Sequence, residues 1–529
     1  MMPRRSLGLL LLAILGGCAQ VREPTGGPVD ETPPRLVLAE PPTGSTGVRP
    51  ERILLSFDER IKLDRVRDNL VISPPLAVAP DVRVTGGRTV EVRLNAPLEQ
   101  GTTYVFNFGN SVLDLTEGNA ASDLNYVIAT GENLDSLTIQ GTVRVANSGM
   151  AAPDVPVMAY PADDTTGFTQ GRPRYLTRTG ARGEFLFHHL APGRYQVYAL
   201  RDKNGNLRYD LPNEEVAFLE GPTEARPLDT LGGRSLDLWL FREHPRQQAI
   251  LDHSVTENGA WRWVFAKPVN EVSIADLARR GGRTTWRMEV SEGRDTVLAW
   301  PSDTTALDAG EYEVSADDVA LDTLKYRRDQ AMPFLLEISP PRPREGTDHL
   351  FSLRTSRPVA VLDQDKALAI GTSGDQPVAL RSDPDEVRSF LVEAPAAMER
   401  LILFPGAVKD IYGGTHDTLR VSLGRVDPAE LGLLRVELRT PERAEGLQWL
   451  EFLDRHGAVA QRQVVDTIPG TYTWPMTPPG IYELRLFHDT NENGRWDPGR
   501  LDDRQQPEVR LRLEGPVNVR PNWEVDVVW

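Results

Sequence analysis

The chain has 529 residues, of which 40% are hydrophobic and 26% are charged, and its formal net charge is −17 at pH 7. A single domain usually has roughly 100–200 residues, so this length predicts several domains, and the composition excludes a largely disordered chain. The acidic charge argues against nucleic acid as a partner, because a negative surface repels the phosphate backbone.

The N-terminal residues have the features of a secretory signal. Two arginines precede an apolar run from Leu7 to Leu15, which is too short to span a bilayer as a helix. Cys18 is the only cysteine and follows the small residues Gly16 and Gly17. This pattern resembles the lipobox of bacterial lipoproteins. The resemblance implies a signal peptide over residues 1–17 and lipidation of Cys18, with palmitate among the acyl chains. An ordinary signal with a chance cysteine is the alternative.

The rest of the chain is predicted to be built from short strands. Residues 18–31 are rich in proline and glycine and predict a flexible tether. Beyond them, apolar residues recur with period two in short runs, such as Arg52–Phe57 and Thr89–Leu94. Such runs, separated by turn residues, are typical of β-sandwiches. The sequence therefore predicts an all-β fold, a string of about five β-sandwich domains. Only Ser273–Arg280 and Asp427–Leu434 have a helical pattern.

One repeated pattern consists of "PPTGSTG", "LLSFDERI" and "VLDLTEGN", which lie in residues 32–131. A second copy with "LRTSRPV" and "LFPGAVKDIYGG" lies in residues 333–425, and a more diverged copy lies in residues 245–332. The pattern resembles the bacterial Ig-like domain (SbsA-like) of envelope and S-layer proteins. The resemblance implies an Ig-like sandwich for each of these three segments.

Another repeat pairs Glu184–Asp210 with Thr471–Asp497, and in both copies a Pro-Gly turn precedes a strand and an Asp/Asn-rich loop. Its "GEFLFHHLAPGRYQV" run resembles the carboxypeptidase regulatory-like, transthyretin-like sandwich. The resemblance implies one such domain at residues 135–241 and a second at residues 428–529. These resemblances are specific for the fold and weak for function, because such sandwiches have many roles.

The two loops in this repeat are candidate calcium sites. Oxygen-bearing side chains alternate along them, as in the first half of a calcium loop. The candidate ligands are Asp489, Asn491, Asn493 and Asp497 in the downstream loop, and Asp202, Asn204, Asn206 and Asp210 in the upstream loop. The bidentate glutamate of position 12 is replaced by Arg500 and Asn213, with Glu214–Glu215 and Asp502–Asp503 just beyond. Asp and Asn also form self-capped turns, and this structural role is the alternative.

No other motif predicts chemistry. The 8 histidines lack zinc-site spacing, and no nucleophile elbow, P-loop or dinucleotide fingerprint occurs. We therefore expect no enzyme activity and no cofactor besides possible calcium. Trp261 and Trp263 are two positions apart in a predicted strand, so their side chains point to the same face. That face belongs either to a domain core or to a glycan-binding surface. Trp523 and Trp529 are expected to close the last sandwich, on the same face as Val525 and Val527.

The arrangement of signal, tether and Ig-like domains resembles uncharacterised lipoproteins of Bacteroidota-type bacteria. It implies a non-catalytic scaffold, spacer or adhesion module in the cell envelope, held at the outer membrane through Cys18. A glycan-binding accessory lipoprotein and an envelope hydrolase with carboxylates in an inter-domain cleft are the alternatives. The membrane is the expected partner, together with an envelope protein or a glycan. The sequence does not assign the face of the outer membrane.

Overall fold

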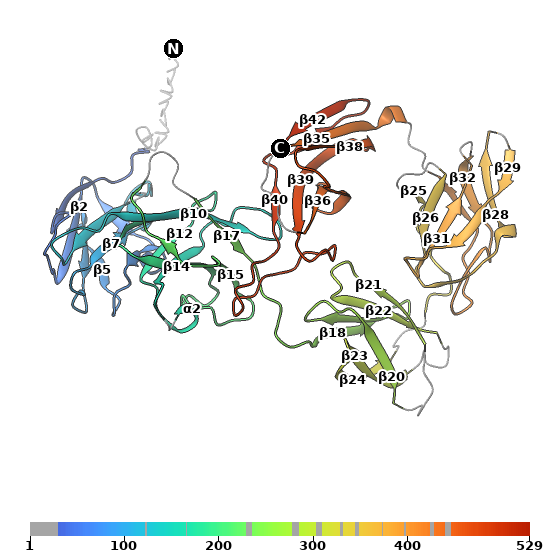
Figure 1. The fold of residues 1–529 in the computed structure, drawn as a ribbon, viewed down its shortest axis with the longest axis horizontal. Coiled ribbons are helices and arrows are strands. Elements are labelled where there is room, and N and C mark those ends of the chain that lie inside the picture. The colour runs from blue at the N-terminus through green and yellow to red at the C-terminus, as the bar shows by residue number, and fades with distance from the viewer. Residues whose placement is uncertain are drawn as a thin grey trace, which may run out of the picture.

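The structure is a computed structural model. It describes residues 30–121, 124–164, 167–228, 235–277, 285–302, 309–327, 332–343, 349–372, 374–395, 398–423, 428–439 and 446–529. Nearly all regular structure in these residues is β-strand. The strands form five sandwiches, which are numbered 1 to 5 in the order of the sequence (Figure 1). The predicted all-β class is confirmed. The residue boundaries of the domains stay predictions, and the signal, Cys18 and most of the tether lie outside the described residues.

Sandwich 1 has an alternating pattern of buried and exposed side chains that follows from the sequence. Its strands are β1 (Leu36–Glu40), β2 (Arg52–Phe57), β3 (Ile61–Leu63), β4 (Val71–Ser73), β5 (Asp81–Thr85), β6 (Thr89–Arg93), β7 (Thr103–Asn107), β8 (Val112–Asp114) and β9 (Asn125–Ala129), and α1 is Val66–Asn69. The sheets have the orders β1-β2-β6-β5, β4-β7-β9 and β3-β8. Ile53, Leu55 and Phe57 of β2 are buried, because alternate side chains of a strand point to the same face.

Sandwich 2 has two sheets packed over one core. Its strands are β10 (Leu137–Val145), β11 (Pro156–Pro161), β12 (Tyr175–Arg178), β13 (Glu184–Leu190), β14 (Arg194–Arg201), β15 (Glu215–Phe218), β16 (Thr223–Glu224) and β17 (Leu236–Leu240), and α2 is Gly167–Gln170. One sheet has the order β13-β10-β17, in which β10 and β17 are parallel. The other has the order β12-β11-β14-β15, and β16 also pairs with β14.

Sandwiches 3 and 4 follow in the chain. Sandwich 3 contains β18 (Ile250–Val255), β19 (Trp261–Phe265), β20 (Val272–Asp276), β21 (Trp286–Val290), β22 (Thr296–Pro301), β23 (Ala309–Ala316) and β24 (Val319–Arg327). Sandwich 4 contains β25 (Arg342–Pro343), β26 (Leu350–Arg354), β27 (Val359–Leu362), β28 (Ala367–Gly371), β29 (Gly374–Pro377), β30 (Ala379–Ser382), β31 (Ser389–Glu393), β32 (Met398–Leu403), β33 (Val408–Asp410) and β34 (Leu419–Ser422), with the 3₁₀ turn Gln364–Lys366. Sandwiches 1 and 4 each have a two-stranded sheet, β3-β8 and β27-β33, besides two larger ones.

Sandwich 5 has the same topology as sandwich 2. Its strands are β35 (Gly432–Leu438), β36 (Leu447–Leu453), β37 (Val459–Val464), β38 (Gly470–Thr477), β39 (Gly480–Asp489), β40 (Arg510–Arg512), β41 (Val517–Val519) and β42 (Glu524–Val528), after the 3₁₀ turn Pro428–Glu430. The sheets have the orders β38-β35-β42 and β37-β36-β39-β40, and β41 also pairs with β39. As in sandwich 2, the terminal strand lies parallel to the first one. This match supports the duplication that the sequence repeat indicates.

Three local expectations are wrong. Residues Ser273–Asp276 of the first predicted helix belong to strand β20, and residues Gly432–Leu434 of the second belong to β35, while residues 278–280 lie outside the described residues. Both segments have β-branched or apolar side chains that pair across a sheet, and this tertiary context outweighs local helix propensity. Trp523 does not close the last sandwich, because it precedes β42 and is 59% exposed, whereas Val525, Val527 and Trp529 pack against the core.

Ion pairs join neighbouring sandwiches. Arg174 of sandwich 2 pairs with Glu99 of sandwich 1 at 2.5 Å. Glu289 of sandwich 3 accepts from Arg388 of sandwich 4 at 2.6 and 2.8 Å and also pairs with Arg354. Burial raises the pKa of Glu289, but the two guanidinium groups outweigh it and hold that pKa below its ordinary value. These contacts join sandwich 1 to 2 and sandwich 3 to 4.

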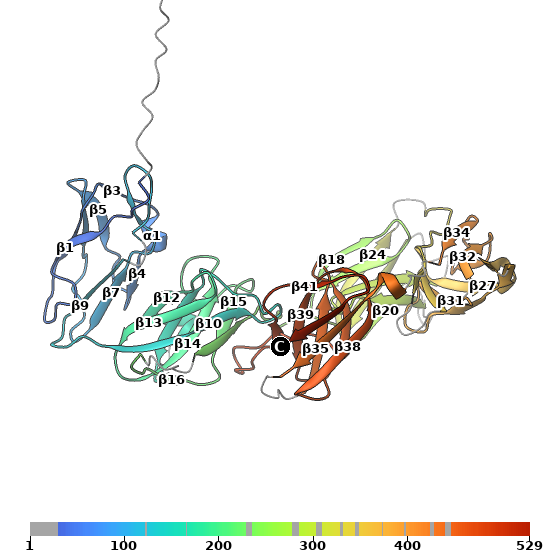
Figure 2. The same ribbon diagram turned by 90° about the horizontal axis from the view of Figure 1, so that it is seen from above.

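A contact between distant parts of the chain joins sandwiches 2 and 5, which lie side by side in both views (Figures 1 and 2). The outer face of the β12-β11-β14-β15 sheet of sandwich 2 carries a second hydrophobic cluster, which is separate from the sandwich core. Trp496 and Leu501 of sandwich 5 pack against this cluster. The cluster includes Met158, Tyr160, Phe168, Tyr198, Leu200, Phe218 and Phe241. The string of sandwiches is therefore folded back on itself, a feature that the strand pattern does not predict.

We predict that the buried ion pair of sandwich 4 is essential for its stability. Arg357 and Asp410 are almost fully buried, and Arg357 Nε lies 2.5 Å from Asp410 Oδ2. Arg357→Ala would leave a buried carboxylate without its partner and should cost about 3–5 kcal/mol of unfolding free energy. Arg381→Ala breaks an exposed pair with Glu393 and should cost about 1 kcal/mol or less. Calorimetry of the mature chain measures both, and similar losses for the two variants would contradict the prediction.

A second prediction concerns acid stability. Asp114 is buried and accepts hydrogen bonds from four backbone N–H groups, those of residues 116–119. Burial raises the pKa of Asp114, but these hydrogen bonds outweigh it and bring the pKa to about 2 from 3.8. Because the folded-state pKa is depressed, this stabilisation is present above the ordinary pKa and is lost as the pH falls toward 2. Thermal unfolding of sandwich 1 should show this loss, and Asp114→Asn should remove it. An unchanged acid profile in the variant would contradict the assignment.

Candidate functional site

The Asp/Asn loops begin where the equivalent strands β14 of sandwich 2 and β39 of sandwich 5 end. In the upstream loop, Asp202 follows β14 and accepts hydrogen bonds from the N–H groups of Asn204, Gly205 and Leu207. Leu207 has a positive φ of 58° at the position that glycine takes in the downstream loop. The leucine side chain packs into the outer hydrophobic cluster of sandwich 2, which explains why an apolar residue stands there.

The downstream loop repeats this arrangement with a more deeply buried aspartate. Asp489 is fully buried, and its oxygens accept from the backbone N–H groups of Asn493 and Gly494 and from Trp449 Nε1. Gly494 has a φ of 73°, in the left-handed region where glycine is favoured. Each loop is thus organised around the first aspartate of its motif.

The structure brings the four candidate residues of each loop together. Asn491 and Asn493 donate their side-chain N–H groups to Asp497 Oδ2, at 2.7 and 2.5 Å. In the upstream loop the matching asparagines, Asn204 and Asn206, donate to the two oxygens of Asp210. Their own side-chain oxygens accept backbone N–H groups two residues further on. These are the self-capped turns that the sequence offers as the structural alternative.

A buried glutamate completes each loop. Glu214 is fully buried and accepts from the backbone N–H groups of Lys203, Asp210 and Leu211. Glu508 is 4% exposed and accepts from Thr490 and from the Asp497 N–H, and burial raises its pKa. Glu214 lies just beyond the predicted motif of its loop, whereas Glu508 lies further along the chain and is not among the predicted residues. The signal that could have found Glu508 is its position just before the next strand, since Glu214 precedes β15 and Glu508 precedes β40, but the connection before Glu508 is longer.

The carboxylate oxygens of both loops are engaged in hydrogen bonds within the loop. Both carboxylate oxygens of Asp489 accept N–H groups of the protein itself. Asp502 and Asp503 are exposed and pair with Arg246 and Arg500. In the part of the chain that the structure describes, no group of three or more His, Cys, Asp or Glu residues is arranged to hold a metal. Calcium binding at the two loops stays an untested alternative to the self-capped turns.

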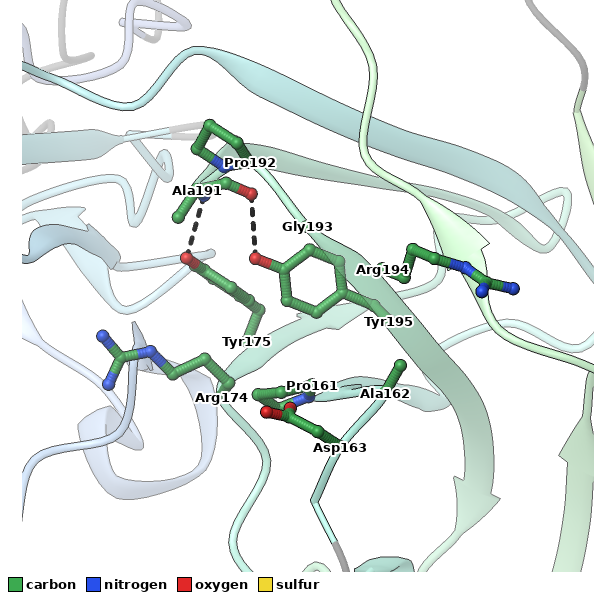
Figure 3. A pocket seen from close by; sticks show the side chains of 10 residues that line it. All are labelled: Pro161, Ala162, Asp163, Arg174, Tyr175, Ala191, Pro192, Gly193, Arg194 and Tyr195. Carbon is green, nitrogen blue, oxygen red and sulfur yellow. Dashed lines mark hydrogen bonds between the residues drawn. The ribbon is translucent and has the colours of Figure 1, made fainter.

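A pocket of about 410 Å³ lies on sandwich 2 near its junction with sandwich 1 (Figure 3). Tyr175 and Tyr195 form its floor, with rings packed edge to face at 5.5 Å. The Tyr175 hydroxyl accepts the Ala191 N–H, and the Tyr195 hydroxyl donates to the Ala191 carbonyl. Arg174 and Arg194 point away from the pocket on opposite sides (Figure 3). The hydroxyl groups of both tyrosines thus hold the backbone at Ala191. Burial raises the pKa of Tyr195.

Trp261 and Trp263 lie in the core of sandwich 3, and neither is exposed. They pack with Trp286, Tyr312 and Tyr326, and the Trp261 and Trp263 ring centroids are 4.8 Å apart. The core assignment is therefore confirmed, and these two rings form no glycan-binding surface. Among the described residues, no helix is long and apolar enough to cross a bilayer.

We predict that calcium does not stabilise sandwich 5, because the Asp489 oxygens already accept hydrogen bonds from the loop. Thermal unfolding in millimolar calcium and in chelator should give the same midpoint. Asp489→Ala should cost about 1–3 kcal/mol in either condition, because buried N–H donors lose their acceptor. Asp503→Ala, on an exposed carboxylate beyond the loop, is the control and should have little effect. A calcium-dependent rise that Asp489→Ala and Asp497→Ala both abolish would contradict the prediction.

Comparisons with known proteins give one family match, over residues 30–130, and several distant structural matches. A search of curated proteins gives no match. Among solved structures, the major pilin subunit BcpA of Bacillus cereus is 10% identical over 75% of this chain and 99% of that chain, with a TM-score of 0.13. The S-layer protein SbsC is 11% identical over 86% of this chain and 65% of that chain, with a TM-score of 0.14. Salmonella alpha-2-macroglobulin is 10% identical over 91% of this chain and 42% of that chain, with a TM-score of 0.15. Residues 30–130, which form sandwich 1, match the bacterial Ig-like domain family.

Proposed function

We propose that this protein is a non-catalytic, lipid-anchored scaffold of the bacterial cell envelope. The observation that supports it most strongly is the set of contacts that join the sandwiches to one another. Buried and charged contacts join sandwiches 1 and 2, sandwiches 3 and 4, and sandwiches 2 and 5. Contacts within a chain that bury apolar side chains restrict domain motion. A chain of sandwiches with restricted motion suits a spacer or a scaffold, because both must hold their binding surfaces at defined positions.

The Ig-like domain of residues 30–130 fits this role, since its family is bacterial and its core is filled by its own side chains. Both carboxylate oxygens of Asp114 accept backbone N–H groups of the turn after β8, and the residue is buried. No observation in the described ranges favours the glycan-binding or hydrolase alternative over the scaffold.

Anchoring rests on the N-terminal sequence. Cys18 is the only thiol of the chain and stands directly after Leu15–Gly17. Each buried CH₂ group of an acyl chain contributes about 0.8 kcal/mol, and one chain alone gives only reversible binding. Two or more acyl chains on Cys18 would therefore hold the protein on the membrane firmly. The outer membrane is the proposed location.

Cys18→Ser tests this proposal. The variant has no thiol to acylate, so it should leave the membrane fraction and appear in the soluble fraction as a folded β-protein. Ala19→Ser is the matched control and should stay with the membrane. Fractionation of cells followed by circular dichroism of the released protein measures both properties. A Cys18→Ser protein that sediments with membranes at moderate salt would contradict the lipid anchor.

A further inference from the structure

The pocket on sandwich 2 has a lining that the duplicated sandwich 5 does not share. Its volume of about 410 Å³ lies within the ~300–1,000 Å³ that is typical of ligand sites. In sandwich 5 the strands β36 and β37 are joined by residues 454–458 alone, whereas residues 162–174 join β11 and β12 in sandwich 2. This longer connection supplies three lining residues, Ala162, Asp163 and Arg174. The pocket is therefore an addition to the common domain, and the shared fold does not require it.

The floor of the pocket is aromatic. Tyr175 and Tyr195 are largely buried, and Figure 3 shows the ring of Tyr195 face-on, with Pro192 above it and Pro161 below it. Both hydroxyl groups are engaged with the Ala191 backbone, so the surface that these residues offer to a ligand is the ring. The face of an aromatic ring carries partial negative charge and attracts cations. The floor therefore favours a positively charged ligand.

A carboxylate lies beside this floor. The side chain of Asp163 is next to Pro161 in Figure 3, and the residue is exposed to solvent. In the described ranges, no hydrogen bond or ion pair occupies this carboxylate. A negative charge next to an aromatic face strengthens the preference for a cation, because the two interactions act on the same group. The pocket thus combines an apolar wall with one acceptor for an ammonium group.

The two arginines of the lining do not neutralise this site. Arg174 reaches sandwich 1, where it pairs with Glu99 at 2.5 Å and donates to the Thr102 hydroxyl at 3.3 Å. Arg194 lies on the other side of the pocket and donates to the Pro222 carbonyl at 3.4 Å. Figure 3 shows both guanidinium groups directed away from the pocket. The net charge of −17 on the whole chain also attracts cations to its surface.

We propose that this pocket binds an organic ammonium group, with the cation over the Tyr195 ring and beside the Asp163 carboxylate. Aromatic faces recognise alkylated ammonium groups in this way. The four-carbon stem of a lysine would lie along Pro161 and Pro192, because such stems cover apolar surface while their charge stays near water. A choline headgroup offers a cation of the same class on a shorter stem. The site adds a binding activity to the scaffold.

Ligand-observed NMR titrations of the Cys18→Ser chain test this proposal with three probes. N-acetyl-lysine amide carries a primary ammonium group, choline carries a quaternary one, and N-acetyl-norleucine amide has a similar stem without charge. We expect the cations to bind and the norleucine derivative to bind far more weakly. Tighter binding of the lysine derivative identifies a protein side chain as the source of the ammonium group, and tighter binding of choline identifies a lipid headgroup. Binding of neither cation, or equal binding of the norleucine derivative, would overturn the proposal.

Variants then locate the site. Asp163→Asn keeps the size of an exposed side chain and removes its charge, so it should weaken binding of the lysine derivative about fivefold. Ala162→Leu should fill part of the pocket and weaken binding of both cations. Asp375→Asn is the matched control, because it removes an exposed carboxylate from sandwich 4 and changes the net charge equally. Equal weakening by Asp375→Asn and Asp163→Asn would show general attraction to the acidic surface and would overturn the assignment of the pocket.

Discussion

The fold-back of the chain depends on one constraint: a sheet in sandwich 2 is apolar on both faces. Along β14, Tyr195, Val197 and Ala199 face the sandwich core, and Tyr198 and Leu200 face the opposite side. Burying a large apolar side chain contributes roughly 1.5–3 kcal/mol, so exposing the second face would cost a substantial part of the stability of a domain. Helix α2, the upstream loop and sandwich 5 together cover that face.

This constraint gives the duplicated loops different roles on the same framework. In both copies an aspartate and a glutamate hold the loop through backbone N–H groups, as Asp489 and Glu508 show. In sandwich 2 the loop folds back over its own sheet, and Tyr209 of this loop donates to Glu243. In sandwich 5 the loop projects outward, and Trp496 packs on sandwich 2. Glu243 accepts from both loops and so couples them.

Strand periodicity predicts the β-class and the inward-facing residues, because both follow from local alternation. The fold-back is not predictable in this way, because the covering residues Trp496 and Leu501 lie about three hundred positions beyond the face they cover. The partial signal is the run "YQVYALR", in which consecutive apolar residues indicate a strand buried on both sides. The periodicity of the last strand places Trp523 in the core, but the strand begins one residue later and leaves that ring at its exposed end.

The asparagines and aspartates of the loops are also predictable as turn residues, but the partner of each is not. Residues 498–507 separate Glu508 from its loop, so its position relative to the motif differs from that of Glu214. Sequence spacing alone therefore assigns position 12 to Arg500, whose guanidinium pairs with Asp503. Only the folded structure shows that a buried carboxylate arrives from further along the chain.

The docking of sandwich 5 on sandwich 2 is the central claim, and a distance measurement tests it directly. Met150 and Glu514 are exposed and lie beside the contact of Gly149 with β40. Nitroxide labels at these two positions, in a chain with Cys18→Ser, report the separation of the two sandwiches by pulsed electron paramagnetic resonance. A single narrow distribution at short distance is the predicted result. A broad distribution at long distances would contradict a folded-back chain and would support an extended string of independent sandwiches.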